Sequence, residues 1–225
     1  MIALNSRACV SLAILILVMA ALIFIPAGTL NYWQAWLFLA VYFASSLATT
    51  LYLMKKDPTL LQRRMRGGPI AEKRATQKII MSLASLGFVG LLVVPALDHR
   101  FGWSHVPSMV ALVADVLIVL GFLGVLRVFK ENTYTSSTIE LADDQRVIST
   151  GPYALVRHPM YAAALGMLIG IPIALGSYVG LIIFVAIVAA VIWRLLDEEK
   201  YLAANLPGYL DYQKKVPHRL IPGVW

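Results

Sequence analysis

Two clusters of ionisable residues flank an uncharged segment in the last third of the chain. The segment 162–193 carries no charged side chain. The clusters consist of Arg157, His158 and Tyr161 before it, and Arg194, Asp197, Glu198 and Glu199 after it. If the segment forms a hairpin of two membrane helices, both clusters lie at one membrane face. Ionisable groups beside lipid are energetically costly, and their usual explanation is a functional site.

The first cluster has the composition of an anion-binding helix start. Pro159 suits the first turn of a helix, where its missing N–H costs nothing. Arg157 and His158 would then lie at the positive end of that helix, among unpaired N–H groups that favour a carboxylate or a phosphate. Tyr161 could add a hydroxyl group or a ring face. The alternative, which these residues leave equally open, is that Arg157 only extends toward water and His158 only caps the helix.

The second cluster combines one cation with three adjacent acids. Arg194 and Glu198 are four residues apart, so they share a helix face and are expected to pair. Glu199 points about a hundred degrees away from Glu198. At the C-terminal end of a membrane helix, acids meet an unfavourable helix dipole. This placement favours a binding role, such as holding ribose hydroxyls or an amino group, over a merely solvated helix end.

Long apolar runs place both clusters in an integral membrane protein. Hydrophobic residues make up 60% of the chain and charged residues 14%, against roughly half and a quarter in soluble domains. The runs are 8–25, 33–54, 79–97, 108–129, 160–175 and 178–196. We expect an all-α polytopic bundle of five or six transmembrane helices, since the middle runs are about 20 residues long. It forms a single domain, 1–225, with N-terminal spans in 1–107 and a catalytic core in 108–225.

The last two runs are expected to form a C-terminal helical hairpin that turns at Leu175-Gly176-Ser177. Glycines four residues apart line one helix face and let another helix approach closely. Two such pairs, Gly166 with Gly170 and Gly176 with Gly180, flank the turn. They predict tight packing of the last two helices against each other.

Basic residues indicate which end of the bundle faces the cytoplasm. Segment 55–78 contains eight Lys or Arg residues against two acids, Asp57 and Glu72, and loops of this kind stay cytoplasmic. Counting spans from it places loop 130–159 and the tail 197–225 on the same side. Both clusters then face the cytoplasm, and the tail is expected to form a short amphipathic helix and a docked arm. These loops account for the net charge of +7. Their basic residues are interpreted as topology signals, with binding to anionic lipid headgroups as the alternative, and no nucleic-acid partner is expected.

Several other site classes lack their motifs. The sequence has no Gly-x-Gly-x-x-Gly, P-loop, Cys pair or His-Glu-x-x-His. Its four His residues are dispersed and its single Cys9 lies in an apolar run, so no metal site is expected. Loop 130–150 adds polar residues near the same membrane face, namely Asn132, Glu140, Asp143 and Asp144.

The order of these motifs resembles the isoprenylcysteine carboxyl methyltransferase and phospholipid methyltransferase superfamily. The resemblance covers about residues 118–222. It rests on Gly151-Pro152-Tyr153, Arg157-His158-Pro159-x-Tyr161, a hydrophobic hairpin, Arg194 with Glu198-Glu199, Gly208-x-x-x-Tyr212 and Lys214-Lys215-Val216-Pro217. Upstream, Gly121, Gly124 and Asn132 look like the lead-in to the cofactor pocket of that family.

The resemblance implies S-adenosyl-L-methionine as the methyl donor, with S-adenosyl-L-homocysteine as its product. It implies that the cofactor is bound by His158, Tyr161 and Glu198 or Glu199, while Arg194 faces the acceptor. The donor's carboxylate suits the helix start at Arg157 and His158. Its ammonium or ribose suits an acid, and its sulfonium suits the faces of Tyr153 or Tyr161.

The acceptor is expected to be lipophilic and to enter from the bilayer between helices. Arg194 could orient an acceptor carboxylate, and Glu198 could accept a proton from an acceptor amine. The compact length looks like that of the prokaryotic members of the superfamily. We therefore expect a bacterial or archaeal cytoplasmic membrane, with an isoprenylcysteine-like carboxylate or a phospholipid-like amine as the acceptor.

Two other functions compete with methyl transfer. A sterol- or steroid-type membrane reductase carries an Arg-x-Pro-x-Tyr motif and binds NADPH, but it often has an acid soon after that Tyr, where this chain has Ala162, Ala163 and Ala164. A non-catalytic transporter or assembly factor would place charges inside its spans. Only Asp115 and Arg127 do so here, near the ends of the fourth span.

Overall fold

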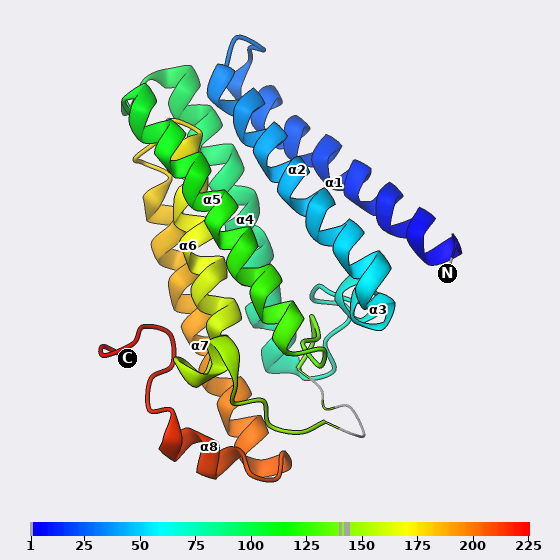
Figure 1. The fold of residues 1–225 in the computed structure, drawn as a ribbon. Coiled ribbons are helices and arrows are strands. Elements are labelled where there is room, and N and C mark those ends of the chain that lie inside the picture. Colours follow the sequence, from blue (N-terminus) through cyan, green and yellow to red (C-terminus); the bar gives the residue numbers. More distant parts are fainter. Residues whose placement is uncertain (1, 140, 142–144) are drawn as a thin grey trace.

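Helices running lengthwise beside one another form the body of the protein (Figure 1). The computed structural model describes residues 2–139, 141 and 145–225. Its helices are α1 (Ile2–Ala27), α2 (Trp33–Lys56), α3 (Pro58–Met65), α4 (Ala75–Phe101), α5 (Ser108–Glu131), η1 (Gly151–Ala154), α6 (Pro159–Ala174), α7 (Leu181–Asn205) and α8 (Tyr209–Lys215). No strand occurs within those ranges. The predicted all-α membrane bundle is confirmed.

Four of the helices, α1, α2, α4 and α5, are long and apolar enough to cross a membrane. Helix α6 is apolar but has only 16 residues, which gives it a length of about 24 Å. A hydrocarbon core is about 30 Å thick. The expected shorter leg of the C-terminal hairpin is therefore confirmed, and its turn lies where the sequence places it, with Gly176 at a φ of 81°.

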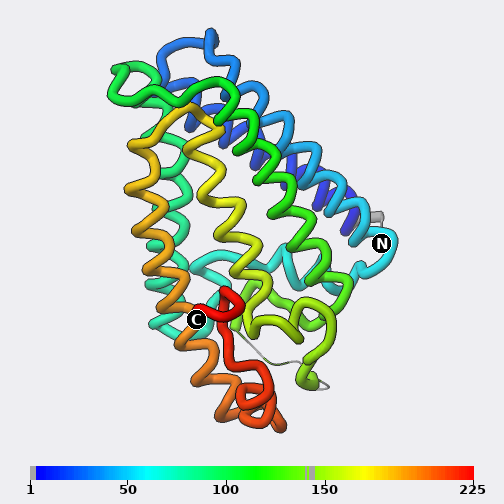
Figure 2. The backbone as a smooth tube through the Cα atoms, turned by 60° about the vertical axis from the view of Figure 1, so that its left-hand side comes forward, coloured from blue at the N-terminus to red at the C-terminus, as the bar shows by residue number. Residues whose placement is uncertain are grey.

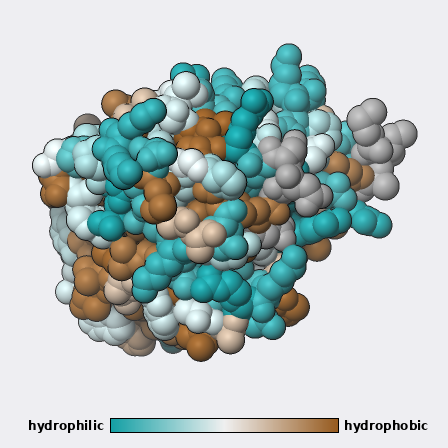
Figure 3. Space-filling view, turned by 90° about the horizontal axis from the view of Figure 1, so that it is seen from below, coloured by the Kyte–Doolittle hydropathy of each residue, from teal (hydrophilic) through white to brown (hydrophobic). Residues whose placement is uncertain are grey.

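Basic residues gather at one end of the bundle. The turns 28–32, 102–107 and 175–180 lie at the upper end in Figure 1, and segments 57–74, 132–139, 145–158 and 206–225 lie at the lower end. At the upper end, Arg100 is the only Lys or Arg of the described residues. Seen from below, hydrophilic side chains predominate with apolar ones among them (Figure 3). The structure thus gathers the basic segments at one end, and the cytoplasmic position of that end stays a prediction from the positive-inside rule.

Hydrogen bonds at the upper end fix the hairpin turn. The Tyr32 hydroxyl donates to the carbonyl oxygen of Leu175, and its ring stacks on His99 with centroids 3.8 Å apart. The buried Asp98 carboxylate accepts hydrogen bonds from the hydroxyls of Ser104 and Ser177. Because these contacts join α4 to the turn before α7, they set how deeply α6 and α7 descend toward the other end.

Close helix packing occurs between α5 and α6, and between the last two helices at Gly180, where a built Cβ would lie 2.6 Å from Pro172 Cβ. A Cβ built on Gly121 would lie 2.6 Å from Met167 Cβ, and one built on Gly124 would lie 2.9 Å from Ala163 Cβ. The packing predicted for the first glycine pair is wrong. Gly170 lies against Ala114 and Ile118 of α5, and a Cβ at Gly166 would have open space.

Adding one methyl group at Gly121 is expected to destabilise the protein by about 1–3 kcal/mol. The Cβ of a Gly121→Ala variant would press on the backbone of α6 as well as on Met167, with Ala163 O only 3.1 Å away. Gly166→Ala is the matched control, because its Cβ meets nothing within 4 Å, and it should be neutral or slightly stabilising. Chemical denaturation in detergent micelles measures both. Equal effects of the two changes would contradict this view of the packing.

The end of α7 differs from the sequence prediction. The last apolar run ends near residue 196, but the helix continues to Asn205. Glu199 therefore lies six residues before the helix end, and the predicted clash of these acids with the helix dipole is wrong. The extension is stabilised by apolar contacts, since Leu206, Tyr209 and Tyr212 form a small core with Leu202.

Candidate functional site

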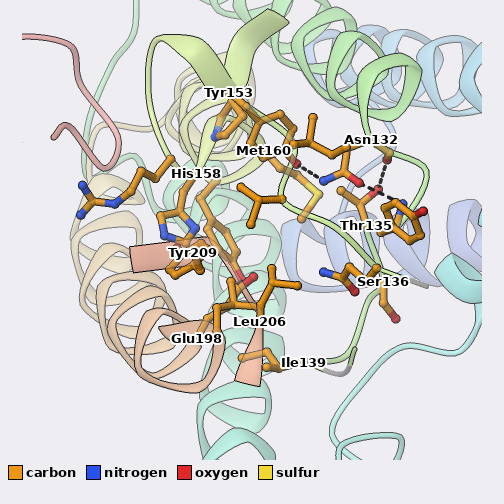
Figure 4. Close-up of a pocket in the computed structure, with 18 of the residues that line it drawn as sticks. Asn132, Thr135, Ser136, Ile139, Tyr153, His158, Met160, Glu198, Leu206 and Tyr209 are labelled. Carbon is orange, nitrogen blue, oxygen red and sulfur yellow. Dashed lines mark hydrogen bonds between the residues drawn. The ribbon is translucent and has the colours of Figure 1, made fainter. Parts of the chain in front are cut away.

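A polar pocket at the lower end collects most of the residues predicted for the site (Figure 4). It is lined from the segment after α5, from the start of α6 and from the lower part of α7. The predicted residues in its wall are Asn132, Tyr153, Arg157, His158, Tyr161, Arg194 and Glu198. The pocket arises because the hairpin of α6 and α7 returns the chain to the end where it started. Glu199 lies behind the wall, among Arg157, His158 and Arg219.

The start of α6 is held by the C-terminal arm. Pro159 is the first helical residue, as predicted. The backbone N–H groups of Arg157 and His158 donate to the carbonyl oxygens of His218 and Arg219, each at 2.9 Å. These two donors, which could have faced an anion, thus bind the arm instead. Figure 2 shows the arm returning to this point, and the predicted docking of the tail is confirmed.

Glu199 is the anchor of that arm. Its Oε1 accepts from Arg157 Nε at 2.7 Å and lies 3.2 Å from His158 Nε2, while its Oε2 accepts from Arg219 Nε at 3.0 Å. Burial raises the pKa of this carboxyl group, but the hydrogen bonds from His158, Arg157 and Arg219 outweigh it and lower the pKa to about 2. Glu199 is therefore ionised at neutral pH.

Arg157 also serves mainly to hold the C-terminal arm in place. Its Nη1 donates to the carbonyl oxygens of Val216 and Pro217, both at 2.8 Å, in addition to the bond from Nε to Glu199. The side chain is almost fully buried. Arg157 lines the pocket, so its positive charge acts on the pocket's contents even though most of its donors are occupied.

Tyr161 connects Arg194 with Glu198. Arg194 Nε donates to the Tyr161 hydroxyl at 3.0 Å, and that hydroxyl donates to Glu198 Oε2 at 2.6 Å. The predicted pairing of the two charged groups thus occurs through a bridging hydroxyl, while the described ion pair of Arg194 is with Glu72. Glu198 lines the pocket, and its Oε2 accepts the bond from Tyr161. No cation of the described residues forms an ion pair with Glu198.

Arg194 is held by residues that the sequence did not single out. Its Nη1 lies 2.8 Å from Glu72 Oε1 and donates to Gln77 Oε1 at 2.7 Å, and its Nη2 donates to the carbonyl oxygen of Ser137 at 3.0 Å. Both Glu72 and Gln77 are buried. A signal existed in the sequence, since Glu72 is one of two acids among eight cations and Gln77 lies two residues before an apolar run.

The opposite wall of the pocket is built around Tyr153. Asn132 Nδ2 donates to the Tyr153 hydroxyl at 3.0 Å, and the Tyr212 hydroxyl donates to the Tyr153 carbonyl oxygen at 2.8 Å. Burial raises the pKa of Tyr153, so its hydroxyl is neutral and its ring is available as an aromatic face. Three acids predicted near this face, Glu140, Asp143 and Asp144, lie outside the described residues.

A second, mostly apolar cavity of about 640 Å³ adjoins the polar pocket. Its walls come from α1, α2, α3, α4, α5, α6 and α7, and its volume is in the range of small-molecule sites. The two spaces share four residues, Ser136, Met160, Tyr161 and Arg194. A polar ligand and an apolar ligand could therefore meet across one wall.

One comparison with known protein families matches the stretch of the chain that carries most residues of this site. Residues 109–207 match the sequence model of the family described as phospholipid methyltransferase. The nickel-cobalt-cadmium resistance protein NccN of Alcaligenes xylosoxydans xylosoxydans is 24% identical over 135 residues, which are 53% of this chain and 63% of that protein. The cobalt-zinc-cadmium resistance protein CzcN of Cupriavidus metallidurans is 25% identical over 107 residues, 47% of this chain and 49% of that protein. The chain thus spans about half to just under two thirds of the length of these relatives.

Proposed function

We propose, because residues 109–207 match the sequence model of the phospholipid methyltransferase family, that this membrane protein transfers a methyl group from S-adenosyl-L-methionine to a lipophilic acceptor. The family and the apolar helices support a membrane methyltransferase. Our proposal adds three points to this: the identity of the donor, the class of acceptor and the cytoplasmic position of the site. The site end carries nearly all the cations of the described chain, which supports its cytoplasmic position.

The observation that carries the proposal is the wall shared by the two spaces. Methyl transfer is an in-line displacement, so the donor and acceptor atoms must be held about 3 Å apart with little covalent help from the protein. A soluble polar donor needs a polar pocket, and a membrane-resident acceptor needs an apolar one. Met160, Tyr161 and Arg194 lie where these spaces meet.

The residues of the polar pocket fit the donor. When bound, the donor supplies an electrophilic methyl group on a sulfonium cation. We assign the ammonium or ribose hydroxyls to Glu198, which lines the pocket and has its Oε2 bonded to Tyr161, and the carboxylate to the positive surroundings of His158 and Arg157. The rings of Tyr153 and Tyr161 would lie against the cation, with Asn132 fixing the Tyr153 hydroxyl. Glu199 acts as a positioning residue, because it holds Arg157 and His158 in place.

Arg194 is the residue that we assign to the acceptor. It lines both spaces and is held rigidly by Glu72, Gln77 and Tyr161. A guanidinium fixed in this way orients a carboxylate and stabilises charge without reorganisation. For an amine acceptor, Glu198 would accept the released proton. Both acceptors resemble those of the superfamily, a prenylcysteine-like carboxylate and a phospholipid-like amine.

The names of the two relatives refer to metal resistance. Such a name describes a cellular role and not a reaction. In the chain as far as it is described, no three His, Cys, Asp or Glu side chains come together as metal ligands. We therefore propose no metal substrate for this chain.

Ligand-dependent stability tests the proposal on the purified full-length protein in detergent. S-adenosyl-L-homocysteine at about a hundred times its dissociation constant should raise the melting temperature by roughly 5–10 °C, and NADPH should not. Stabilisation by NADPH alone would instead favour a reductase, and a response to neither would reject the donor. Incubation with methyl-labelled donor and a lipid extract then identifies the class of acceptor by the labelled product.

A further inference from the structure

Arg64 of α3 places a guanidinium group in the wall of the apolar cavity. Its Nη1 donates to the carbonyl oxygen of Ser136 at 3.0 Å and lies 3.8 Å from Met160 Sδ. The guanidinium carbon also lies 5.2 Å from the centre of the Phe129 ring. These contacts hold the charged group in one position beside Met160, which also lines the polar pocket.

The charge of Arg64 is not balanced by a carboxylate among the described residues. The two other arginines nearby are balanced, since Arg194 pairs with Glu72 and Arg74 pairs with Asp197, each at 2.8 Å. The pKa of Arg64 is lowered, chiefly by burial and also by the nearby positive charge of Arg194. Only an ionised Tyr161 hydroxyl would raise this pKa. Arg64 is partly buried, and a partly desolvated cation without a charged partner carries a cost. An anionic ligand would remove that cost.

The rest of the cavity suits a hydrocarbon chain. Apolar side chains from several helices make up most of its wall, including Leu12, Leu15, Leu53, Phe122 and Val125, and α2 adds the hydroxyl groups of Ser46, Thr49 and Thr50. Arg64 lies where the cavity meets the polar pocket, because it contacts Ser136 and Met160, which line both spaces. The cavity therefore combines an apolar body with one uncompensated cation beside the shared wall.

We propose that Arg64 forms the anion-binding end of this cavity and that the cavity takes an amphiphile with an acidic headgroup, a carboxylate or a phosphate ester. The hydrocarbon part lies between the helices, and the headgroup lies against Arg64, next to Met160. This binding site is inferred from the cavity and the charge balance alone. The assignment of this site to the methyl acceptor rests on the proposed methyltransferase function. Arg64 lies outside residues 109–207, so the N-terminal half would select the acceptor for a domain supplied by the C-terminal half.

Binding of a matched series of amphiphiles, without any methyl donor, tests this inference. Titrations followed by thermal shift would use dodecanoate, dodecyl phosphate, dodecanol and inorganic phosphate with the full-length protein in a neutral detergent. A hydrogen-bonded pair with a charged group predicts about tenfold tighter binding of an acid than of dodecanol. Comparing dodecanoate with dodecyl phosphate tells which acid is preferred, and inorganic phosphate should bind far more weakly than either.

Arg64→Gln should remove the preference for the acids and leave the affinity for dodecanol unchanged. Arg66→Gln, which removes the same charge from an exposed side chain of the same segment, should keep the preference, and Arg64→Lys should keep part of it. Equal binding of dodecanol and the acids by the unaltered protein would overturn the inference, as would an unchanged preference in Arg64→Gln. Stabilisation by S-adenosyl-L-homocysteine, measured in parallel, reports on the proposed function separately.

Discussion

A Glu198→Gln variant is expected to bind S-adenosyl-L-homocysteine roughly ten- to a hundredfold more weakly than the unaltered protein. Glu198 is the acid of the polar pocket that lacks an ion-pair partner among the described residues, and the Tyr161 hydroxyl engages only its Oε2. Glutamine keeps the shape of the side chain but loses the charge that favours an ammonium group and strengthens hydrogen bonds to a ribose. Thermal-shift titration or calorimetry in detergent measures the change in affinity.

Two further variants show whether the effect belongs to the pocket. Asp211→Asn removes a negative charge from an exposed pair with Lys214 and should leave the affinity unchanged. Tyr161→Phe keeps the charge of Glu198 but removes the hydroxyl between it and Arg194, so it should lower turnover more than affinity. If Glu198→Gln bound the ligand as tightly as the unaltered protein, Glu198 would have no role in holding it.

The pocket could be predicted from the sequence because its residues are related by simple topology. Residues directly before and directly after an apolar hairpin must meet at one end of a helical bundle, wherever the helices pack. His158, Tyr161, Arg194 and Glu198 satisfy that relation, and all four line one pocket. The helix start at Pro159 was equally predictable, since proline is favoured in the first turn.

The partners of Arg194 could not be predicted in this way. Spacing along a helix proposes only neighbours on the same helix, and it proposed Glu198. A long arginine side chain can reach another helix, and the structure gives it Glu72 and Gln77 from around the start of α4. A buried arginine pairs with whichever carboxylate tertiary packing places beside it. Which carboxylate that is depends on contacts between segments that are distant in the sequence.

The end of α7 was misplaced for a related reason. Hydropathy falls where a helix leaves the membrane, which is not where the helix must end. Helix α7 continues because Leu202 packs with Leu206 and Tyr209, residues that follow the apolar run. The extension also determines which acid faces the ligand, since it places Glu198 in the pocket wall and Glu199 against the arm.

Exchanging Glu199 for glutamine is expected to lower the free energy of unfolding by about 3 kcal/mol at neutral pH. The pKa of its carboxyl group falls from 4.5 to about 2 in the folded protein, so the folded state favours the charged form. Such a group stabilises the protein fully above a pH of about 4.5, and the contribution is lost as the pH falls toward 2. Glu199→Gln should therefore lose the part of the acid sensitivity that arises in this range. Denaturation in detergent at several pH values measures both effects.

The surface pair of Asp211 and Lys214 supplies the matched control, because their side chains are 75% and 79% exposed. Asp211→Asn should change stability by less than about 0.5 kcal/mol. A second readout separates loss of the arm from general destabilisation. Since Glu199 joins Arg157 and His158 to Arg219, the Gln variant should release the arm and speed tryptic cleavage after Lys214 and Lys215 under native conditions. An arm that remained as resistant in Glu199→Gln as in Asp211→Asn would show that the backbone bonds of Arg157 and His158 to residues 218 and 219 hold it without the carboxylate.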